Sequence, residues 1–426
     1  MQLKKYQLRS LREFEAFLLR LREKEQAILP TYPALKSVGS VLPDPAEAAW
    51  KDLFQHRRYV SRVNAVGEPV PNVCLKIPTG GGKTLLACHA IASLSRVYRH
   101  SNYGMVLWIV PTDQIYTQTL RALKDRDHSY RRALDAASGG RTKVIGKEDR
   151  FEPEDVRDSM VVMVMMLQSA NRKNQDYLKA FKSSGKFIGF FPESDRYDFN
   201  SGIIEDNGLD VVEDLFQRLS PKTSLGNVMK LVRPMVIVDE GHKASSFLAR
   251  DTIFSLNPSI VVELTATPYE GVQNTLVQIG GMDLLEEGMI KLDMHVTTKA
   301  SDDWKDTLRE SLAKLNVLQD ESYRYRSNSN IYIRPICLIQ VERTGKDQRD
   351  GELVHSEDVR EFLVNECSIP TESVAVKTSQ INELKQYDNL LSELCPVRFI
   401  ITQRALQEGW DCSFAYILSI LTNPKS

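Results

Sequence analysis

The sequence predicts an α/β protein in which two parallel-sheet lobes follow a helical segment. From residue 73 onward, short runs rich in β-branched residues or methionine alternate with helix-like stretches, which is typical of buried parallel strands joined by helices. A second series of such runs begins near residue 331. Helical spacing and capping signals dominate the first part of the chain. We therefore expect a helical segment over residues 1–70, a first lobe over 71–293 and a second lobe, incomplete at its C-terminus, over 294–426.

Two helices are expected in the helical segment. The first stops before Pro30 and has a charged outer face, and its apolar residues recur at helical spacing at Leu8, Leu11, Phe14, Leu18 and Leu21. The second opens with an N-cap, a first-turn proline and a capping-box acid, which are Asp44, Pro45 and Glu47. Both patterns indicate amphipathic helices that pack against the rest of the chain.

The strands are expected at the apolar runs. In the first lobe these are residues 73–77, 105–110, 161–165, 235–238 and 260–264. In the second lobe they are residues 331–341, 373–376, 397–401 and 415–421. Residues 171–230 are polar and contain several turn-forming segments, so we expect an insertion with some helix there.

Length and composition exclude several classes of protein. The 426 residues, 42% of them hydrophobic, are enough for two or three packed domains. Fifty-five Lys and Arg residues balance 56 Asp and Glu residues, so a positive field over the whole molecule is excluded and any nucleic-acid site must be local. The six cysteines are scattered without a Cys-x-x-Cys pair, and we find no signal peptide or membrane-spanning run. We expect reduced thiols in a cytoplasmic protein.

The most specific local signal is a glycine-rich loop between an expected strand and an expected helix. Backbone amides can converge on a phosphate only where side chains do not obstruct them, and the helix N-terminus adds favourable charge. Lys83 is expected to reach the β and γ phosphates, and the Thr84 hydroxyl to bind Mg²⁺. Ile77 stands where the general motif has a glycine. An ordinary glycine-rich turn is the alternative to a loop formed by Thr79, Gly80, Gly81, Gly82, Lys83 and Thr84.

A pair of acids follows the expected strand at 235–238, at the strand end where α/β sheets place ligands. Asp239 is expected to hold Mg²⁺, while Glu240 orients and deprotonates the attacking water. Taken alone, such a pair is usually a turn; after a phosphate loop it indicates catalysis. Thr265 and Thr267 end the next expected strand and could report the state of the γ phosphate to the acidic motif. His242 has the same coupling role or is simply a hydrogen-bonding loop residue.

Together these motifs resemble those of superfamily-two helicases and translocases, and in particular the Res subunits of type III restriction enzymes. The resemblance rests on Pro78 to Thr84, Asp239 to His242, Thr265 to Thr267, and the Glu-Gly-Trp-Asp segment at residues 408–411. It implies two RecA-like lobes, a DEAD/DEAH-box-like motor driven by ATP and Mg²⁺, DNA as the track and a methyltransferase subunit as a possible partner. It covers most of the chain except the insertion.

The resemblance also assigns roles residue by residue. Gln7 is implied to read the adenine edge, with an exposed glutamine at a helix start as the alternative. Gly409 and Asp411 are implied to lie near both nucleotide and nucleic acid. Contacts to the nucleic-acid backbone are implied for Pro111, Thr112, Gln118, Gln168 and Ser169, with strand-end capping as the alternative. A basic cluster at residues 121–132, with Lys143 and Lys147, is a phosphate track or a solvated helix face.

Two features of the family are missing from this sequence. The arginine-bearing motif should follow residues 415–421, and in related enzymes an arginine finger contributes about a thousandfold or more to phosphoryl transfer. We therefore expect an N-terminal fragment that binds ATP better than it hydrolyses it. There is also no nuclease constellation. Two other functions stay open, a helicase that acts on RNA and a nucleotide-dependent switch or scaffold that moves nothing.

Overall fold

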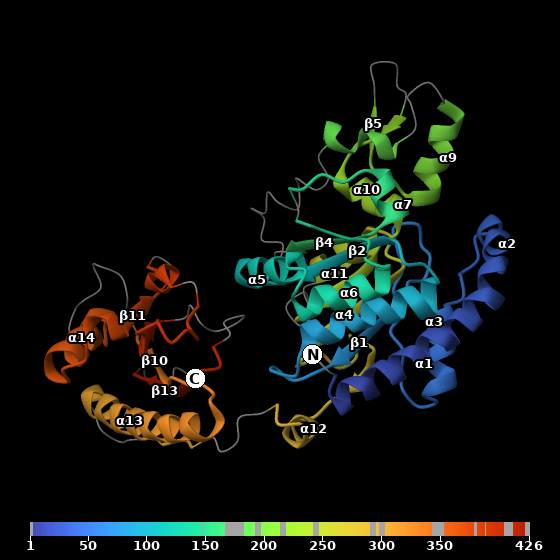
Figure 1. Cartoon of the computed structure of the whole chain (residues 1–426). Coiled ribbons are helices and arrows are strands. Elements are labelled where there is room, and N and C mark those ends of the chain that lie inside the picture. The colour runs from blue at the N-terminus through green and yellow to red at the C-terminus, as the bar shows by residue number, and fades with distance from the viewer. Residues whose placement is uncertain are drawn as a thin grey trace. The chain divides into compact units, whose positions relative to one another are not determined.

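The computed structural model in Figure 1 divides into two compact units, Met1–Asp293 and Met294–Ser426. Each unit is an α/β lobe built on a parallel sheet, as predicted, and we describe each by itself. The described residues are 3–146, 148–166, 183–191, 197–213, 219–241, 247–289, 295–297, 303–342, 353–378, 381–387, 389–403 and 412–421. Among them, no helix has the length and apolarity needed to span a bilayer.

The N-terminal helices pack as predicted. Helix α1 (Lys5–Ile28) continues through a short 3-10 turn, Leu29–Thr31, into α2 (Tyr32–Ser37), and α3 is Pro45–Leu53. The Asp44 side chain caps α3 by accepting hydrogen bonds from two backbone amides, at 2.8 and 3.2 Å. Phe17 of α1 meets Trp50 of α3 edge to face, with ring centroids 6.3 Å apart. Leu8 differs from its prediction, since it is 41% exposed.

The first lobe contains a seven-stranded sheet in the order β3-β4-β2-β7-β8-β1-β9, with all neighbours parallel. The five predicted strands are β1 (Asn72–Lys76), β2 (Gly104–Val110), β4 (Met160–Met166), β7 (Met235–Asp239) and β8 (Ile260–Thr265). The two edge strands, β3 (Thr142–Ile145) and β9 (Thr275–Gln278), were not predicted. They are four residues long and only partly buried at several positions, so their apolar signal is weak.

Helices cover both faces of this sheet (Figure 1). Alternate residues of β2 point to opposite faces, so Val106 and Trp108 join one core while Met105 and Leu107 join the other. The first core includes α1 together with α4 (Lys83–Ser93) and α6 (Ser129–Ser138). The second includes α10 (Leu225–Val232) and α11 (Phe247–Ser255). Outside the insertion, the described residues of this lobe also form α5 (Asp113–Lys124), α7 (Pro153–Asp158), α12 (Gly281–Glu286) and a π-type continuation of α4, Leu94–Arg99.

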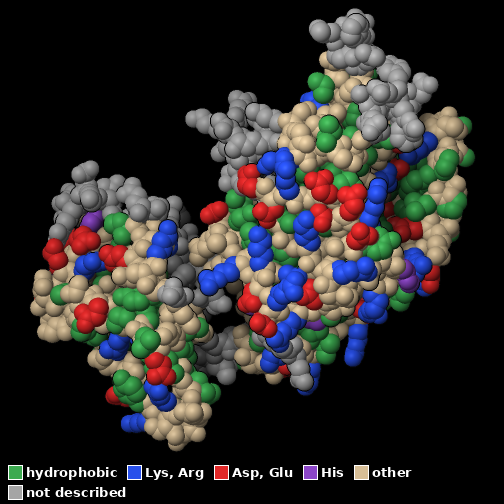
Figure 2. All heavy atoms as spheres, turned by 45° about the horizontal axis from the view of Figure 1, so that its top comes forward, with side chains coloured by type: hydrophobic (Ala, Val, Ile, Leu, Met, Phe, Trp, Pro, Cys, Tyr) green, Lys and Arg blue, Asp and Glu red, His purple; other side chains and the backbone are tan. Residues whose placement is uncertain are grey.

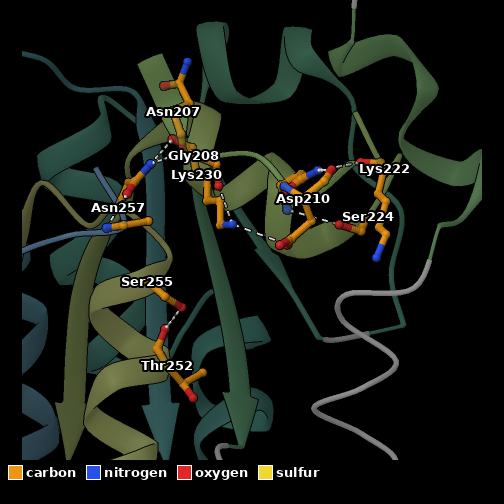
Figure 3. Close-up of polar contacts among 11 residues, drawn as sticks. Asn207, Gly208, Asp210, Lys222, Ser224, Lys230, Thr252, Ser255 and Asn257 are labelled. Carbon is orange, nitrogen blue, oxygen red and sulfur yellow. Dashed lines mark hydrogen bonds and ion pairs between the residues drawn. The ribbon is translucent and has the colours of Figure 1, made fainter. Parts of the chain in front are cut away.

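The described part of the insertion is a small module on the first lobe. It contains a 3-10 turn at Gly185–Phe190, helix α9 (Tyr197–Asn207) and a hairpin of β5 (Val211–Glu213) and β6 (Leu219–Pro221). Figure 3 shows how the module joins the lobe. The buried Lys230 Nζ donates to the Gly208 carbonyl at 2.7 Å and lies 3.3 Å from Asp210 Oδ2, while Asn257 Nδ2 donates to the Asn207 carbonyl at 2.8 Å. The contact of Asn257 therefore ties the described part of the insertion to the lobe through a partly buried hydrogen bond, whereas the contacts of Lys230 lie within residues 171–230.

The second unit has a four-stranded parallel sheet in the order β11-β12-β10-β13. Its strands are β10 (Ile336–Gln340), β11 (Val374–Lys377), β12 (Phe399–Thr402) and β13 (Ala415–Ile420), at the four predicted runs. Helices α13 (Trp304–Ser329) and α14 (Ser356–Glu361), the latter extended by a π-type turn at Phe362–Glu366, contribute apolar residues to the core on one face. The strand β10 begins later than predicted, at Ile336. Just before it, the buried Arg334 guanidinium donates to the carbonyls of Leu390, Ser392 and Val397.

Candidate phosphate-binding loop and acidic pair

The glycine-rich loop connects β1 to α4. At its start, Ile77 is fully buried and its amide donates to the Thr265 carbonyl at 2.9 Å, so the β-branched residue is part of the core rather than of the turn. Gly80 and Gly82 have φ of +81° and +72°, which side chains rarely adopt. Gly81 is a glycine for a different reason, since a Cβ there would lie 2.7 Å from Ile77 Cγ2. Close packing thus fixes the path of the loop.

The loop leaves the first turn of α4 open to an anion. Gly82 is the N-cap of α4, and among the described residues no side chain caps this end of the helix. The first backbone amides of a helix lack partners within the helix and carry partial positive charge. Thr79 and Gly80 are exposed, and Lys83 and Thr84 are the first two residues of the helix. The arrangement suits a phosphate group.

The structure brings the loop and the acidic pair together. Strand β8 lies between β1 and β7, so the carboxyl ends of β1 and β7 are separated by one strand. Lys83 Nζ lies 2.6 Å from Glu240 Oε1, and their side chains are only 10% and 19% exposed. Lys83 Nζ is buried and has no hydrogen bond of good geometry within the described residues, so the ion pair does not satisfy the ammonium. A buried ammonium with unused donors fits a phosphate oxygen.

Asp239 ends β7 and is 8% exposed. Its Oδ1 accepts a hydrogen bond from the Glu240 amide at 3.0 Å, and Glu240 has a φ of +52°, in the left-handed region. Burial, followed by the charge of Glu240, raises the pKa of Asp239 to about 6, against an opposing effect of Lys83. An acid that is costly to ionise when the site is empty gains from a divalent cation, and carboxylate and hydroxyl oxygens are the ligands that Mg²⁺ prefers.

A comparison with protein families assigns the chain to one of them. The family model described as "Type III restriction enzyme, res subunit" (ResIII) matches residues 1–270, which include the loop and the acidic pair. The chain belongs to the ResIII family. The resemblance to superfamily-two helicases and to Res subunits is therefore confirmed, and the RecA-like description of the lobes follows from it together with the parallel sheets.

Solved structures that resemble this ResIII chain have low sequence identity and low TM-scores. Dbp5 of S. cerevisiae, bound to RNA and ADP BeF3, is 11% identical with a TM-score of 0.36, over 84% of this chain and 72% of that one. The type ISP restriction-modification enzyme LlaGI, as a nuclease-deletion mutant with a DNA substrate mimic, is 13% identical with a TM-score of 0.26, over 65% and 21%. The yeast DEAD-box splicing factor Prp28 is 12% identical with a TM-score of 0.23, over 80% and 64%.

This ResIII chain thus spans about a fifth of LlaGI. No curated protein matches the chain. The family assignment rests on the family model alone.

The predicted coupling residues occupy the next strand end. Thr265 is fully buried at the end of β8, and its hydroxyl accepts from the Thr267 amide at 3.2 Å, while Thr267 is exposed. The acidic motif is joined to this strand through the backbone, because the Gly241 amide donates to the Leu264 carbonyl at 3.2 Å. His242, Gly409 and Asp411 lie outside the described residues.

Sequence reasoning missed a buried polar cluster beneath the acidic motif. Glu263 of β8 is 8% exposed, lies 3.4 Å from the Arg250 guanidinium and accepts from the Gln273 amide. Arg250 also donates to the Val272 carbonyl at 3.3 Å. A Cβ on Gly241 would lie 2.7 Å from Glu263 Oε2, so the cluster directly supports the residue after Glu240. The sequence signal that could have indicated this cluster was Glu263, a charged residue within an otherwise apolar strand.

Gln7 contacts the loop from α1. It is 2% exposed, its Nε2 donates to the Gly81 carbonyl at 3.2 Å and its Oε1 accepts from the Lys4 amide at 3.0 Å. The alternative of an exposed glutamine is wrong. Each end of the amide is engaged by the chain itself, and each keeps one further hydrogen-bonding position.

The predicted nucleic-acid contacts lie apart from the loop in sequence. The Thr112 hydroxyl accepts from the Ile115 amide at 3.3 Å and caps the start of helix α5, where strand-end capping was the predicted alternative. Pro111 is partly buried and Gln118 is exposed on α5. Gln168 and Ser169 lie outside the described residues.

The basic cluster at 121–132 is largely paired with acids. Arg131 is 6% exposed and bonds to Asp135, Lys124 pairs with Asp149, and Lys143 pairs with Asp155. Lys147 lies outside the described residues. Figure 2 shows Lys and Arg interspersed with Asp and Glu on the face of the first unit that it displays. The pairing favours a solvated surface over a dedicated phosphate track.

The raised pKa of Asp239 predicts a stability effect with a defined pH window. Because the native state binds this proton more tightly than the unfolded state, stability falls as pH rises from about 3.8 to about 6. Asp239→Asn should therefore stabilise the ligand-free protein at pH 7.5 by about 3 kcal/mol, because raising the pKa from 3.8 to about 6 costs about that much in the ionised protein. Urea denaturation should show the gain shrinking to zero near pH 4.

Asp283→Asn is the matched control for that measurement. A hydrogen bond from the Gly280 amide and another from Arg9 lower the pKa of Asp283, so its replacement should be destabilising at neutral pH and less so in acid. Equal pH profiles for the two variants would contradict the effect of burial on Asp239.

Proposed function

We propose that the chain is the motor core of an ATP-dependent DNA translocase or helicase, related to type III restriction Res subunits. The single observation that supports it most directly is the 2.6 Å contact between Lys83 and Glu240. It joins a glycine loop and an acid that are more than 150 residues apart in sequence. Both lie at the carboxyl ends of the strands, as ATP hydrolysis requires.

The roles of the side chains follow from their surroundings. The phosphates lie on the first amides of α4, and their oxygens compete with Glu240 for the Lys83 ammonium. Glu240, released from that ion pair, orients the attacking water and takes its proton. Thr84 and Asp239 hold Mg²⁺, which when bound neutralises charge on the phosphate oxygens. Gln7, Gly409 and Asp411 contact the nucleotide, and His242, Thr265 and Thr267 couple its state to the rest of the lobe.

DNA is the proposed track because the family is that of a restriction subunit. Pro111, Thr112, Gln118, Gln168 and Ser169 contact its backbone without reading sequence. A methyltransferase subunit as partner and a cytoplasmic location belong to the same proposal. RNA as the track remains the alternative with the same chemistry, and a switch that moves nothing is the alternative of another class.

The test compares ATP hydrolysis with no nucleic acid, with duplex DNA and with RNA of equal length, at matched ionic strength because affinity depends steeply on salt. We expect DNA to stimulate hydrolysis more than RNA. Stronger stimulation by RNA would favour the RNA helicase. ATP binding without stimulation by either, and without DNA binding, would favour the switch.

A further inference from the structure

The hydroxyl of Tyr6 makes a contact with the phosphate loop that the proposed chemistry does not use. Tyr6 Oη donates to the Gly81 carbonyl at 2.8 Å, across 75 residues of sequence. Gln7 Nε2 donates to the same carbonyl at 3.2 Å. Tyr6 is 3% exposed, and burial raises its pKa, so its hydroxyl remains a proton donor at all working pH values.

The carbonyl that Tyr6 holds governs the next amide of the loop. Because the peptide unit is planar and trans, fixing the Gly81 carbonyl also fixes the direction of the Gly82 N–H, on the opposite side of the peptide. The Gly81 amide itself donates to the Pro78 carbonyl at 3.0 Å. Both polar atoms of Gly81 are thus held within the chain, and Gly82, the N-cap of α4, is the next residue able to present its amide to a ligand.

Tyr6 is not what holds α1 on the lobe. Arg9 of α1 pairs with Asp283 of α12 at 2.8 Å, and Lys4 Nζ donates to the Glu287 carbonyl at 3.1 Å. Further along, the apolar face of α1 is buried in the first core. Removing one hydroxyl from Tyr6 should therefore leave the helix in place and change only the loop.

We propose that Tyr6 is a positioning residue for the phosphate loop, which orients the Gly82 amide toward bound phosphate by anchoring the Gly81 carbonyl. The inference rests on the proposed binding of ATP at this loop and adds to it a residue that acts through the backbone. It does not require Tyr6 to touch the nucleotide.

The experiment uses Tyr6→Phe, which deletes the hydroxyl and keeps the ring. One neutral hydrogen bond contributes about 0.5–1.5 kcal/mol, so the Kd for ATP should rise by about two- to thirteenfold, with Gln7 still bonded to Gly81. Inorganic tripolyphosphate has no base, and its affinity, measured by competition with ATP, should fall by the same factor. Adenosine, which has no phosphate, should bind as it does to the wild type.

Tyr32→Phe is the matched control. The Tyr32 hydroxyl donates to the Pro43 carbonyl at the same 2.8 Å, and Tyr32 is 8% exposed, but it lies in α2, away from the loop. The two variants should lose similar thermal stability, and only Tyr6→Phe should lose phosphate affinity. Unchanged ATP affinity in Tyr6→Phe, or an equal loss in Tyr32→Phe, overturns the inference while leaving the proposed function intact. A wild-type chain that binds neither ATP nor tripolyphosphate overturns both.

Discussion

Lys83→Ala should weaken ATP binding by about ten- to a hundredfold, since hydrogen bonds to charged groups contribute about 1.5–3 kcal/mol each. Turnover should fall by a further factor of about a hundred to a thousand, because the ammonium also stabilises charge that develops during phosphoryl transfer. Binding is measured by calorimetry and turnover by phosphate release. If this variant bound ATP as tightly as the wild type, the assignment of the loop as a phosphate-binding site would be contradicted.

Two companion variants sharpen that experiment. Lys143 lies 2.6 Å from Asp155 in the same lobe, as Lys83 does from Glu240, so Lys143→Ala removes an ion pair of equal length away from the loop and should leave ATP binding unchanged. Glu240→Gln removes the proposed base and releases Lys83. It should bind ATP as tightly as the wild type, or more tightly, and hydrolyse almost none.

Glu263→Ala should destabilise the first lobe by about 3–5 kcal/mol, because it leaves the buried guanidinium of Arg250 without its carboxylate. The free energy of unfolding in urea measures this loss. Glu263→Gln keeps the hydrogen-bonding shape and should cost less. Since Glu263 contacts Gly241, we also expect Glu263→Gln to lower turnover more than ATP affinity.

An exposed ion pair provides the control for Glu263. Glu13 lies 4.0 Å from Arg9 and its side chain is 47% exposed, so Glu13→Ala should change stability by less than about 1 kcal/mol. If Glu263→Ala were as mild as Glu13→Ala, the buried cluster would have no structural importance.

The sequence predicted those helices and strands whose signals lie within a few neighbouring residues. Nine strands and the first helices lie where apolar runs and capping residues placed them, because most of those strands are buried and Asp44 caps its own helix. The edge strand β13 is mostly exposed or half-buried but still has an apolar run. The edge strands β3 and β9 were missed because partial burial gives them no apolar run. The partners of Arg334, just before β10, are carbonyls more than 50 residues away, which no local window contains.

Some residues of the candidate site were likewise predictable from the sequence, and others were not. The residue types of the loop and of the acidic pair were readable, because phosphate and Mg²⁺ chemistry constrains them within a few neighbouring positions. The roles of Tyr6 and Glu263 were not predicted, because they depend on partners that the sequence does not place beside them.

By itself, the sequence determined that this chain has an α/β fold, a glycine loop suited to phosphate and two acids at a strand end. The tertiary structure alone decided that Lys83 meets Glu240, that Tyr6 holds the Gly81 carbonyl and that Glu263 supports Gly241. The physical reason is that backbone preference and burial act over a few residues. Strand order and side-chain contacts are set by the packing of the whole lobe.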